Sequence, residues 1–167
     1  MKRALVLFLV LAGSGLNTKA QDYDKSIGIR GGFSSGITYK QSVGDDKALE
    51  FIMSNRWSNR WRGWKITGLY EVYRRDFNVY GLTWYYGAGA HIGYYRHWGV
   101  WGGPGKGNQY YYSDYTLAPG LDAIFGIEFK IPDVPLAASL DWKPEINFWR
   151  YNPFWADEFA LSIRYTF

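Results

Sequence analysis

The last nine residues of the chain, Phe159 to Phe167, read FALSIRYTF and decide the fold. Hydrophobic side chains occupy every second position of this stretch, and small or polar side chains occupy the positions between them. Such alternation is typical of a β-strand, whose successive side chains point to opposite faces. The stretch therefore predicts a strand with one apolar face and one polar face, and such a strand needs a sheet.

The same alternation recurs along the chain back to Ile27. Counting the last one, we expect eight strands, over residues 26–33, 37–43, 48–56, 64–73, 82–95, 121–131, 136–148 and 159–167. We expect a tight turn at 34–36, and a long loop rich in Gly, Trp and Tyr over 96–115. The connections after the second, fourth and sixth strands are short, and those after the third, fifth and seventh are longer.

The chain begins with a segment typical of secretory signal peptides. Lys2 and Arg3 precede an apolar run over 4–12, and the segment 18–20 approximates a small-residue cleavage site. The apolar run is much shorter than the roughly 20 residues that span a bilayer as a helix. We therefore expect residues 1–20 to be a cleaved signal peptide and residues 21–167 to be one exported domain.

Charge and composition exclude some functions. Without the leader, the basic residues fall from 19 to 16 against 15 acidic residues, so the mature chain carries a net charge of about +1. Nucleic-acid binding, which would need a strong basic excess, loses its support. The sequence contains no cysteine, which excludes disulfides and thiol chemistry. Twenty glycines and a 20% aromatic content suit a β-structure whose two faces meet different solvents.

Eight alternating strands can form a soluble barrel with its apolar face inward or a membrane barrel with its apolar face outward. The polar face carries nearly balanced charges, which we expect to pair inside a narrow lumen: Arg30, Lys40, Glu50, Arg56, Lys65, Glu71, Asp122, Glu128, Lys130, Asp141, Lys143, Glu145 and Arg164. The apolar face is aromatic toward the strand ends, as at bilayer interfaces. We therefore predict an all-β fold, an eight-stranded antiparallel up-and-down transmembrane β-barrel with its apolar face outward and a polar lumen.

Two further features bear on this barrel. Alternating short and long connections are typical of outer-membrane barrels, which have short periplasmic turns and long outer loops. Pro144 removes a hydrogen-bond donor from the seventh strand, so we expect a bulge there or a strand that leaves the bilayer.

The chain resembles the small eight-stranded outer-membrane β-barrels of Gram-negative bacteria, of the OmpA/OmpX type, over residues 26–167. The most specific element is the last strand, which ends in Arg164-Tyr165-Thr166-Phe167. In that family the barrel assembly machinery reads a final aromatic residue after an alternating strand, so the resemblance implies an assembly signal at Tyr165 and Phe167. It also implies an outer-membrane location among lipid and lipopolysaccharide. Family members differ in activity, so the resemblance implies no particular one.

Three functions fit such a barrel: a structural or surface-interaction role with a lumen filled by side chains, a narrow porin or transport channel, and a lipid A-modifying enzyme. Eight strands and nearly balanced charges favour the filled lumen. An enzyme would need a nucleophile, a base and an acid. The available residues, His97, Ser113, Asp114 and Glu158, are expected on loops and match no known spacing.

No second His or Cys lies at metal-ligand spacing from His91, so we interpret His91 as a hydrogen-bonded lumen residue. We predict no enzymatic activity, no cofactor, no metal site and a monomeric state.

The only internal repeat is Ser54-Asn55-Arg56-Trp57 followed by Ser58-Asn59-Arg60-Trp61. It gathers basic and aromatic residues on an expected outer loop: Arg56, Trp57, Arg60, Trp61 and Arg62. Guanidinium groups bind phosphate and tryptophan settles at bilayer interfaces, so one hypothesis is contact with a lipopolysaccharide headgroup. The alternative, which we favour, is an ordinary aromatic girdle with snorkelling arginines. The tyrosines of the 96–115 loop could form a contact surface or a lid, and the sequence does not choose between these.

Overall fold

The computed structural model describes residues 24–57, 61–77, 79–102, 109–148, 154–156 and 158–167; at 61, 97–102 and 109–114 it describes the backbone alone. The strands are β1 (Lys25–Gly32), β2 (Ser34–Gly44), β3 (Lys47–Trp57), β4 (Trp61–Arg74), β5 (Leu82–Gly102), β6 (Gln109–Lys130), β7 (Leu136–Trp142), β8 (Glu145–Asn147), β9 (Phe154–Trp155) and β10 (Phe159–Thr166). They make eight barrel strands, because β7 and β8 are parts of the seventh and β9 and β10 are parts of the eighth. In the described part of the chain, no helix is long and apolar enough to cross a membrane.

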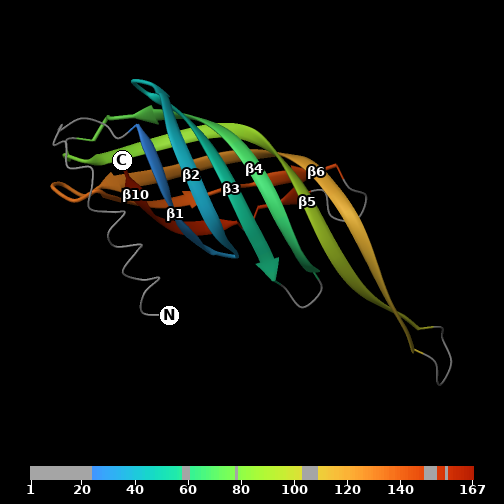
Figure 1. Ribbon diagram of the computed structural model, residues 1–167. Coiled ribbons are helices and arrows are strands. Elements are labelled where there is room, and N and C mark those ends of the chain that lie inside the picture. Colours follow the sequence, from blue (N-terminus) through green and yellow to red (C-terminus); the bar gives the residue numbers. More distant parts are fainter. Residues whose placement is uncertain (1–23, 58–60, 78, 103–108, 149–153, 157) are drawn as a thin grey trace, which may run out of the picture.

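The first and last strands close the barrel (Figure 1). β1 pairs with β10 in an antiparallel register that places Ile29 opposite Ile163. At the end of this seam the Lys25 amide donates to the Phe167 carbonyl at 3.0 Å, and the Phe167 amide donates to the Lys25 carbonyl at 2.9 Å. Each strand is antiparallel to its neighbours around the ring, which confirms the predicted eight-stranded up-and-down barrel.

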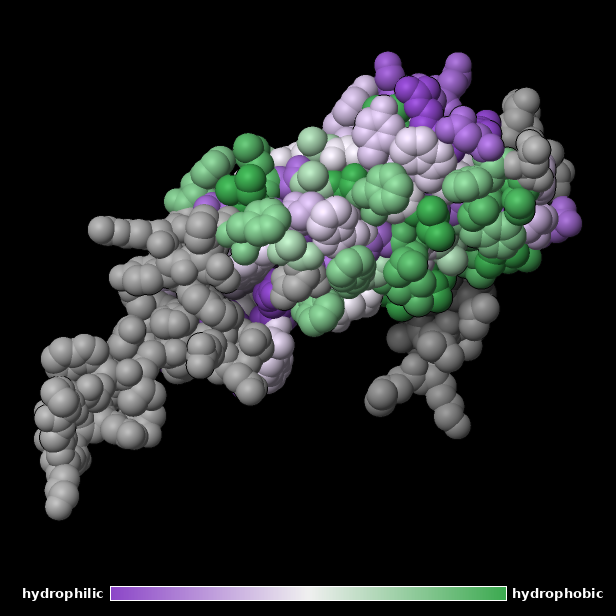
Figure 2. Space-filling model, turned by 180° about the vertical axis from the view of Figure 1, so that it is seen from behind, coloured by the Kyte–Doolittle hydropathy of each residue, from purple (hydrophilic) through white to green (hydrophobic). Residues whose placement is uncertain are grey.

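The two faces of the strands have the predicted polarity. On β10, the Ile163 side chain is 49% exposed on the outside, while its neighbour Arg164 is 0% exposed on the inside. The same reversal holds around the barrel, and Figure 2 shows hydrophobic side chains spread over one side of its outer surface. Exposed outer residues include Ile29, Ile37, Phe51, Ile66, Leu121, Phe125, Leu140 and Leu161. The apolar face is therefore outward.

The predicted loop over 96–115 is wrong, because most of it is strand. β5 runs on to Gly102 and β6 begins at Gln109, and the two pair continuously from Arg96 opposite Tyr115 to Gly102 opposite Gln109. β4 follows β5 only as far as His97, so the β5–β6 hairpin reaches beyond its neighbours (Figure 1). The glycines of this stretch suggested a loop, whereas its Tyr, Trp and Val residues favour paired strands.

Connection lengths follow the predicted alternation only in part. β3 ends at Trp57 and β4 begins at Trp61, so this connection is shorter than residues 75–81 between β4 and β5. The asymmetry of the barrel comes instead from the long β5–β6 hairpin. The predicted turn at 34–36 is wrong as well, because β2 already begins at Ser34 and only Phe33 separates it from the end of β1.

The irregularity expected at Pro144 includes a bulge in the neighbouring last strand. Lys143 and Pro144 separate β7 from β8, yet the register with β6 continues without a shift from the pair Trp142–Phe125 to the pair Glu145–Asp122. On the other side, Trp142 pairs with Phe159 but Glu145 pairs with Trp155, so the last strand contains one additional residue. This bulge turns Trp155 inward, while Glu158, the residue before the outward Phe159, lies inside the barrel by regular alternation and is fully buried.

Candidate functional site

The inside of the barrel holds most of its charge in three groups. The inner cluster, nearer the end with the chain termini, consists of Lys40, Glu50, Glu71, Glu128 and Arg164. The central pair is Arg30 and Asp141. The outer cluster, nearer the opposite end, consists of Lys65, His91, Asp122, Lys143, Glu145 and Glu158. All of these side chains are at most 5% exposed.

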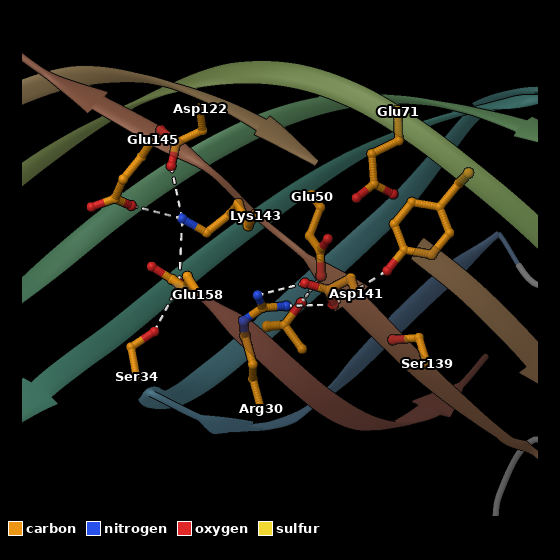
Figure 3. Close-up of polar contacts among 12 residues, drawn as sticks. Arg30, Ser34, Glu50, Glu71, Asp122, Ser139, Asp141, Lys143, Glu145 and Glu158 are labelled. Atoms are coloured by element: carbon orange, nitrogen blue, oxygen red, sulfur yellow. Dashed lines mark hydrogen bonds and ion pairs between the residues drawn. The ribbon is translucent and has the colours of Figure 1, made fainter. Parts of the chain in front are cut away.

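The central pair bridges two strands that are not neighbours. Arg30 on β1 donates from Nη1 to Asp141 Oδ2 at 2.7 Å and from Nη2 to Asp141 Oδ1 at 2.6 Å. The hydroxyl of Tyr85 on β5 donates to Asp141 Oδ2 at 3.3 Å, so three strands meet at one carboxylate. A bidentate guanidinium–carboxylate pair is strong and fixes the geometry of both side chains. Figure 3 shows this pair between the two clusters.

Arg164 organises the inner cluster from β10. Its Nη1 donates to Glu50 Oε1 at 3.0 Å, and its Nη2 donates to Glu128 Oε2 at 2.6 Å and to Ser139 Oγ at 2.7 Å. The opposite position on β1 is Gly28, where a Cβ atom would lie 2.6 Å from the Arg164 Cα. Glycine at this position therefore leaves room for the guanidinium-bearing chain.

Lys40 is the second cation of the inner cluster. Its Nζ lies 2.8 Å from Glu71 Oε2, and farther from Glu50 and Glu128, at 3.7 and 3.5 Å. The Tyr85 ring centroid lies 4.4 Å from the same Nζ, and the Tyr73 hydroxyl lies 2.6 Å away. The rings of Tyr73 and Tyr85 belong to an apolar group with Ile52, Leu69 and Ile124. The inner ammonium is therefore enclosed by carboxylates and aromatic rings.

Two lysines share the carboxylates of the outer cluster. Lys143 Nζ lies 2.7 Å from Asp122 Oδ1, 3.0 Å from Glu145 Oε2 and 3.3 Å from Glu158 Oε1. Lys65 Nζ contacts Glu145 Oε2 and lies 2.9 Å from Glu158 Oε2. Ser34 Oγ donates to Glu158 Oε1 at 2.8 Å (Figure 3). Glu145 and Glu158 thus each have two lysine partners.

His91 lies at the edge of the outer cluster. Its Nδ1 is 2.6 Å from Asp122 Oδ2 and its Nε2 is 3.1 Å from Asn147 Oδ1. Ligand atoms of His91, Asp122 and Glu145 lie within 4.8 Å of one another, a spacing compatible with a metal ion. The Lys143 ammonium already lies 2.7 Å from Asp122 and 3.0 Å from Glu145, so it holds the position between them that a cation would take.

Eleven of the thirteen predicted lumen charges lie in these three groups, and two lie apart. Arg56 is half-buried, and its guanidinium carbon lies 4.3 Å from the ring centroid of the buried Trp155. Lys130 Nζ donates to the Val134 carbonyl at 3.1 Å and to Thr166 Oγ1 at 2.9 Å.

Sequence reasoning missed Glu158, because the last strand was expected to begin at Phe159, although Glu158 continues the inward positions of Ala160, Ser162 and Arg164. The side chains that complete the network, such as Tyr85, Ser139 and Asn147, do fall on the inward positions of the alternation.

The structure places residues of the Arg-Trp repeat on different faces of the barrel. Arg56 turns inward, whereas Trp57 is 70% exposed and Arg62 stacks over its ring at 4.1 Å. Arg60 lies outside the described residues, as does the side chain of Trp61. The hypothesis of an outer headgroup contact therefore keeps Trp57 and Arg62 on the outer face and loses Arg56.

The residues considered for catalysis do not all meet. His97 is opposite Asp114, and Ser113 is the next residue along β6, so these three lie on paired strands rather than on loops. Glu158 lies in the lumen, bound by Ser34, Lys65 and Lys143.

The residues of the implied assembly signal lie at the end of β10. Tyr165 pairs with Ile27 on one side and Leu136 on the other. The Phe167 side chain is 59% exposed, and its ring centroid lies 6.2 Å from that of Tyr165.

Comparisons with known proteins bear on the fold. No protein-family model and no curated protein matches the sequence. Among solved structures, the N-terminal β-barrel domain of Pseudomonas aeruginosa OprF is similar with a TM-score of 0.62 at 12% identity, over 89% of this chain and 100% of that one. Ail, the attachment invasion locus protein of Yersinia pestis, is similar with a TM-score of 0.53 at 14% identity, over 86% of this chain and 96% of that one. These likenesses confirm the fold that the resemblance implied, a small eight-stranded barrel of the OmpA/OmpX type.

Proposed function

We propose that this chain is an integral outer-membrane β-barrel with a structural or surface-interaction role, without catalysis, whose lumen is closed by its own charged side chains. The observation that carries the proposal is the reversed polarity of the barrel. Ile163 faces outward and Arg164 inward on the same strand, and turning the barrel strands by one residue would place basic side chains in lipid, where each costs roughly 2–4 kcal/mol at the bilayer midplane and less toward the interfaces. The ring of paired strands also satisfies the backbone groups of the part that lies in lipid, where no water is available.

The sequence patterns at residues 1–20 and in the last strand suggest how the chain is exported and inserted. Residues 1–20 have the pattern of a signal peptide, and we propose that they direct the chain out of the cytoplasm of a Gram-negative cell. The exposed Phe167 and its neighbour Tyr165 would then be read by the barrel assembly machinery. We propose that the inserted protein is a monomer surrounded by lipid and lipopolysaccharide.

The ion-pair network supports a closed lumen over a narrow channel. The Arg30–Asp141 pair bridges the interior between two clusters whose members are all buried. Opening a path through them would separate buried charges, and leaving a buried charge without its partner costs about 3–5 kcal/mol. We therefore propose that the network holds the interior shut.

A surface role is supported by the β5–β6 hairpin, which extends past the strands on either side (Figure 1). Glu158, one of the two acids considered for catalysis, is set apart from His97, Ser113 and Asp114, because its carboxylate is bound by two lysines and Ser34 inside the barrel.

Cell fractionation tests the location. The full chain should appear in the outer-membrane fraction, resist extraction with alkaline carbonate, and migrate faster on gels before boiling than after it. A chain lacking residues 1–20 should stay in the cytoplasm. Recovery of the mature, folded protein in a soluble fraction without detergent would contradict the proposal.

Vesicle swelling tests the closed lumen. Vesicles containing the folded protein should swell in isotonic sugar or amino-acid solutions no faster than empty vesicles, while vesicles with a general porin swell rapidly. Swelling above the empty-vesicle rate would favour the channel.

A further inference from the structure

A groove of about 450 Å³ lies on the outer surface of the barrel, across β2, β3 and β4. Its part nearer the middle of the barrel is lined by one cross-strand row of apolar side chains, each 44–55% exposed: Ile37, Met53 and Ile66. The next row toward the rim opposite the chain termini contains two polar residues and one aromatic residue: Ser35, Asn55 and Trp64. The groove is therefore apolar at one end and partly polar at the other.

The polar end of the groove has two side chains that lack hydrogen-bond partners. Ser35 and Asn55 are direct cross-strand partners, and both side chains are exposed on the outer face. Of the contacts that the described residues make, none is a hydrogen bond to either of these side chains. Side chains opposed in this way have Cβ atoms about 4.5–5.5 Å apart, and both line the same groove. A hydroxyl and an amide can therefore reach one bound molecule.

The polar pair lies farther from the rim than the neighbouring aromatic residue. Trp57 follows Asn55 by two residues on the outward face of β3, about 7 Å nearer the rim, and is 70% exposed. Tryptophan settles at the headgroup level of a bilayer. Ser35 and Asn55 then face the outer part of the hydrocarbon layer, where a polar group without a partner costs free energy. The pair therefore needs a polar atom that a lipid chain brings to this depth.

Membrane lipids differ in where their chains carry oxygen. The acyl chains of a glycerophospholipid carry oxygen only at their ester links, which lie at the headgroup level. The hydroxyacyl chains of lipid A carry a further hydroxyl below that level. A hydroxyl donates and accepts hydrogen bonds, and so do the Ser35 hydroxyl and the Asn55 amide. A hydroxyacyl chain is thus complementary to the polar end of the groove, and its hydrocarbon is complementary to the apolar end.

We propose that the groove binds one hydroxyacyl chain of a lipid A molecule in the outer leaflet. The hydroxyl of the chain hydrogen-bonds to Ser35 and Asn55, and its hydrocarbon lies along the apolar row of Ile37, Met53 and Ile66. This inference rests on the proposed function, which puts the rim opposite the termini at the outer face of the membrane. It differs from the headgroup contact considered for the Arg-Trp repeat, because it uses uncharged side chains and an acyl chain.

Native mass spectrometry of the folded mature protein, released from detergent micelles, tests the proposal. The probe is a glucosamine acylated on nitrogen and oxygen with hydroxymyristoyl chains, and the matched probe carries plain myristoyl chains. We expect a one-to-one complex with the hydroxylated probe. Binding of the plain probe should be weaker by roughly tenfold, since its chains offer the polar pair no hydrogen bond. Neither probe is charged, so the difference reports the hydroxyl alone.

Matched variants assign the binding to this groove. Ser35→Ala with Asn55→Leu should bind the two probes equally, because the hydrogen-bonding pair is gone. Met53→Trp should weaken binding of both probes by filling the groove. Its control is Leu140→Trp on β7, which changes an outward side chain of similar exposure and should bind both probes as the wild type does.

Equal binding of the two probes by the wild type would overturn the inference, as would a preference for the hydroxylated probe that survives in the Ser35/Asn55 variant. A dimer that binds neither probe would assign the groove to a second copy of the chain and would overturn it too. Gel mobility before boiling shows that each variant is folded. A wild type that fractionates outside the outer membrane would contradict the proposed function instead, which keeps the two failures apart.

Discussion

The inner and outer clusters of the lumen contain the same charges in different arrangements. Each has two Lys or Arg side chains and three carboxylates, with the Arg30–Asp141 pair between them. In the inner cluster the shortest ion pairs of Glu50 and Glu128 are with one guanidinium, that of Arg164, while Lys40 lies farther from both. In the outer cluster, Lys65 and Lys143 both contact Glu145 and Glu158. Equal charge therefore does not mean equal tolerance to the loss of one cation.

The backbone is also more regular around the inner cluster than around the outer cluster. The inner cluster lies between regular strands and is enclosed by the Tyr73 and Tyr85 rings. The outer cluster lies where Lys143 and Pro144 interrupt the seventh strand and where the last strand has a bulge between Trp155 and Phe159. Next to these irregular segments, Glu145 and Glu158 are the carboxylates that the two outer lysines share.

The largest expected effect comes from removing one cation in each cluster. Arg164→Met should lower the free energy of unfolding by about 3–5 kcal/mol, because it leaves buried carboxylates short of a partner. Lys143→Met should cost less, roughly 1–3 kcal/mol, because Lys65 still contacts Glu145 and Glu158. Urea titrations in lipid vesicles, followed by tryptophan fluorescence, measure both. Equal losses, or a larger loss for Lys143→Met, would contradict the difference between the clusters.

A smaller effect is expected from the glycines opposite Arg164 and His91. A Cβ at Gly28 would lie 2.0 Å from the Ile163 carbonyl oxygen and 2.6 Å from the Arg164 Cα, so backbone must move. A Cβ at Gly120 would meet one backbone atom instead of two, the Ile146 carbonyl oxygen at 2.3 Å, and its other close neighbour is the His91 ring at 2.5 Å, which can turn in part. Gly28→Ala should cost about 1–3 kcal/mol and Gly120→Ala less. The same urea titrations measure the loss of unfolding free energy in both variants. Gly31→Ala is the control, because its Cβ would meet nothing within 4 Å.

The smallest effect is expected from the carboxylate in excess. The inner cluster has one more carboxylate than cations, so Glu71→Gln should change the free energy of unfolding by less than about 1 kcal/mol. Glu128→Gln, which weakens a 2.6 Å contact to Arg164, should cost roughly 1.5–3 kcal/mol. If Glu71→Gln proved the costlier of the two, Lys40 rather than Arg164 would be the main cation of this cluster.

The strands and their faces could be predicted because the pleat imposes a period of two, and a charged residue such as Arg164 cannot share the lipid face with Ile163. Two features of the strands could not be predicted from the sequence. The β5–β6 hairpin is built from a glycine-rich stretch whose strand structure depends on pairing between its two halves. The other is the bulge between Trp155 and Phe159, which shifts the alternation by one residue and turns Trp155 inward.

The sequence also could not predict which charged side chains pair across the lumen. Arg30 and Asp141 are far apart in the chain and on strands that do not pair, so their bidentate contact depends on the width and stagger of the closed barrel. Alternation predicts which side chains enter the lumen, but the closed geometry selects which of them meet.

Single-channel conductance in planar lipid bilayers tests the central claim, a lumen held shut by its ion pairs. The wild-type protein should give no steady current steps, whereas a variant with both Arg30→Ala and Asp141→Ala, which removes the pair between the clusters, should give small ones. Steady steps of equal size from the wild type and the variant would contradict the account, because ions would then pass a lumen that the pair does not close.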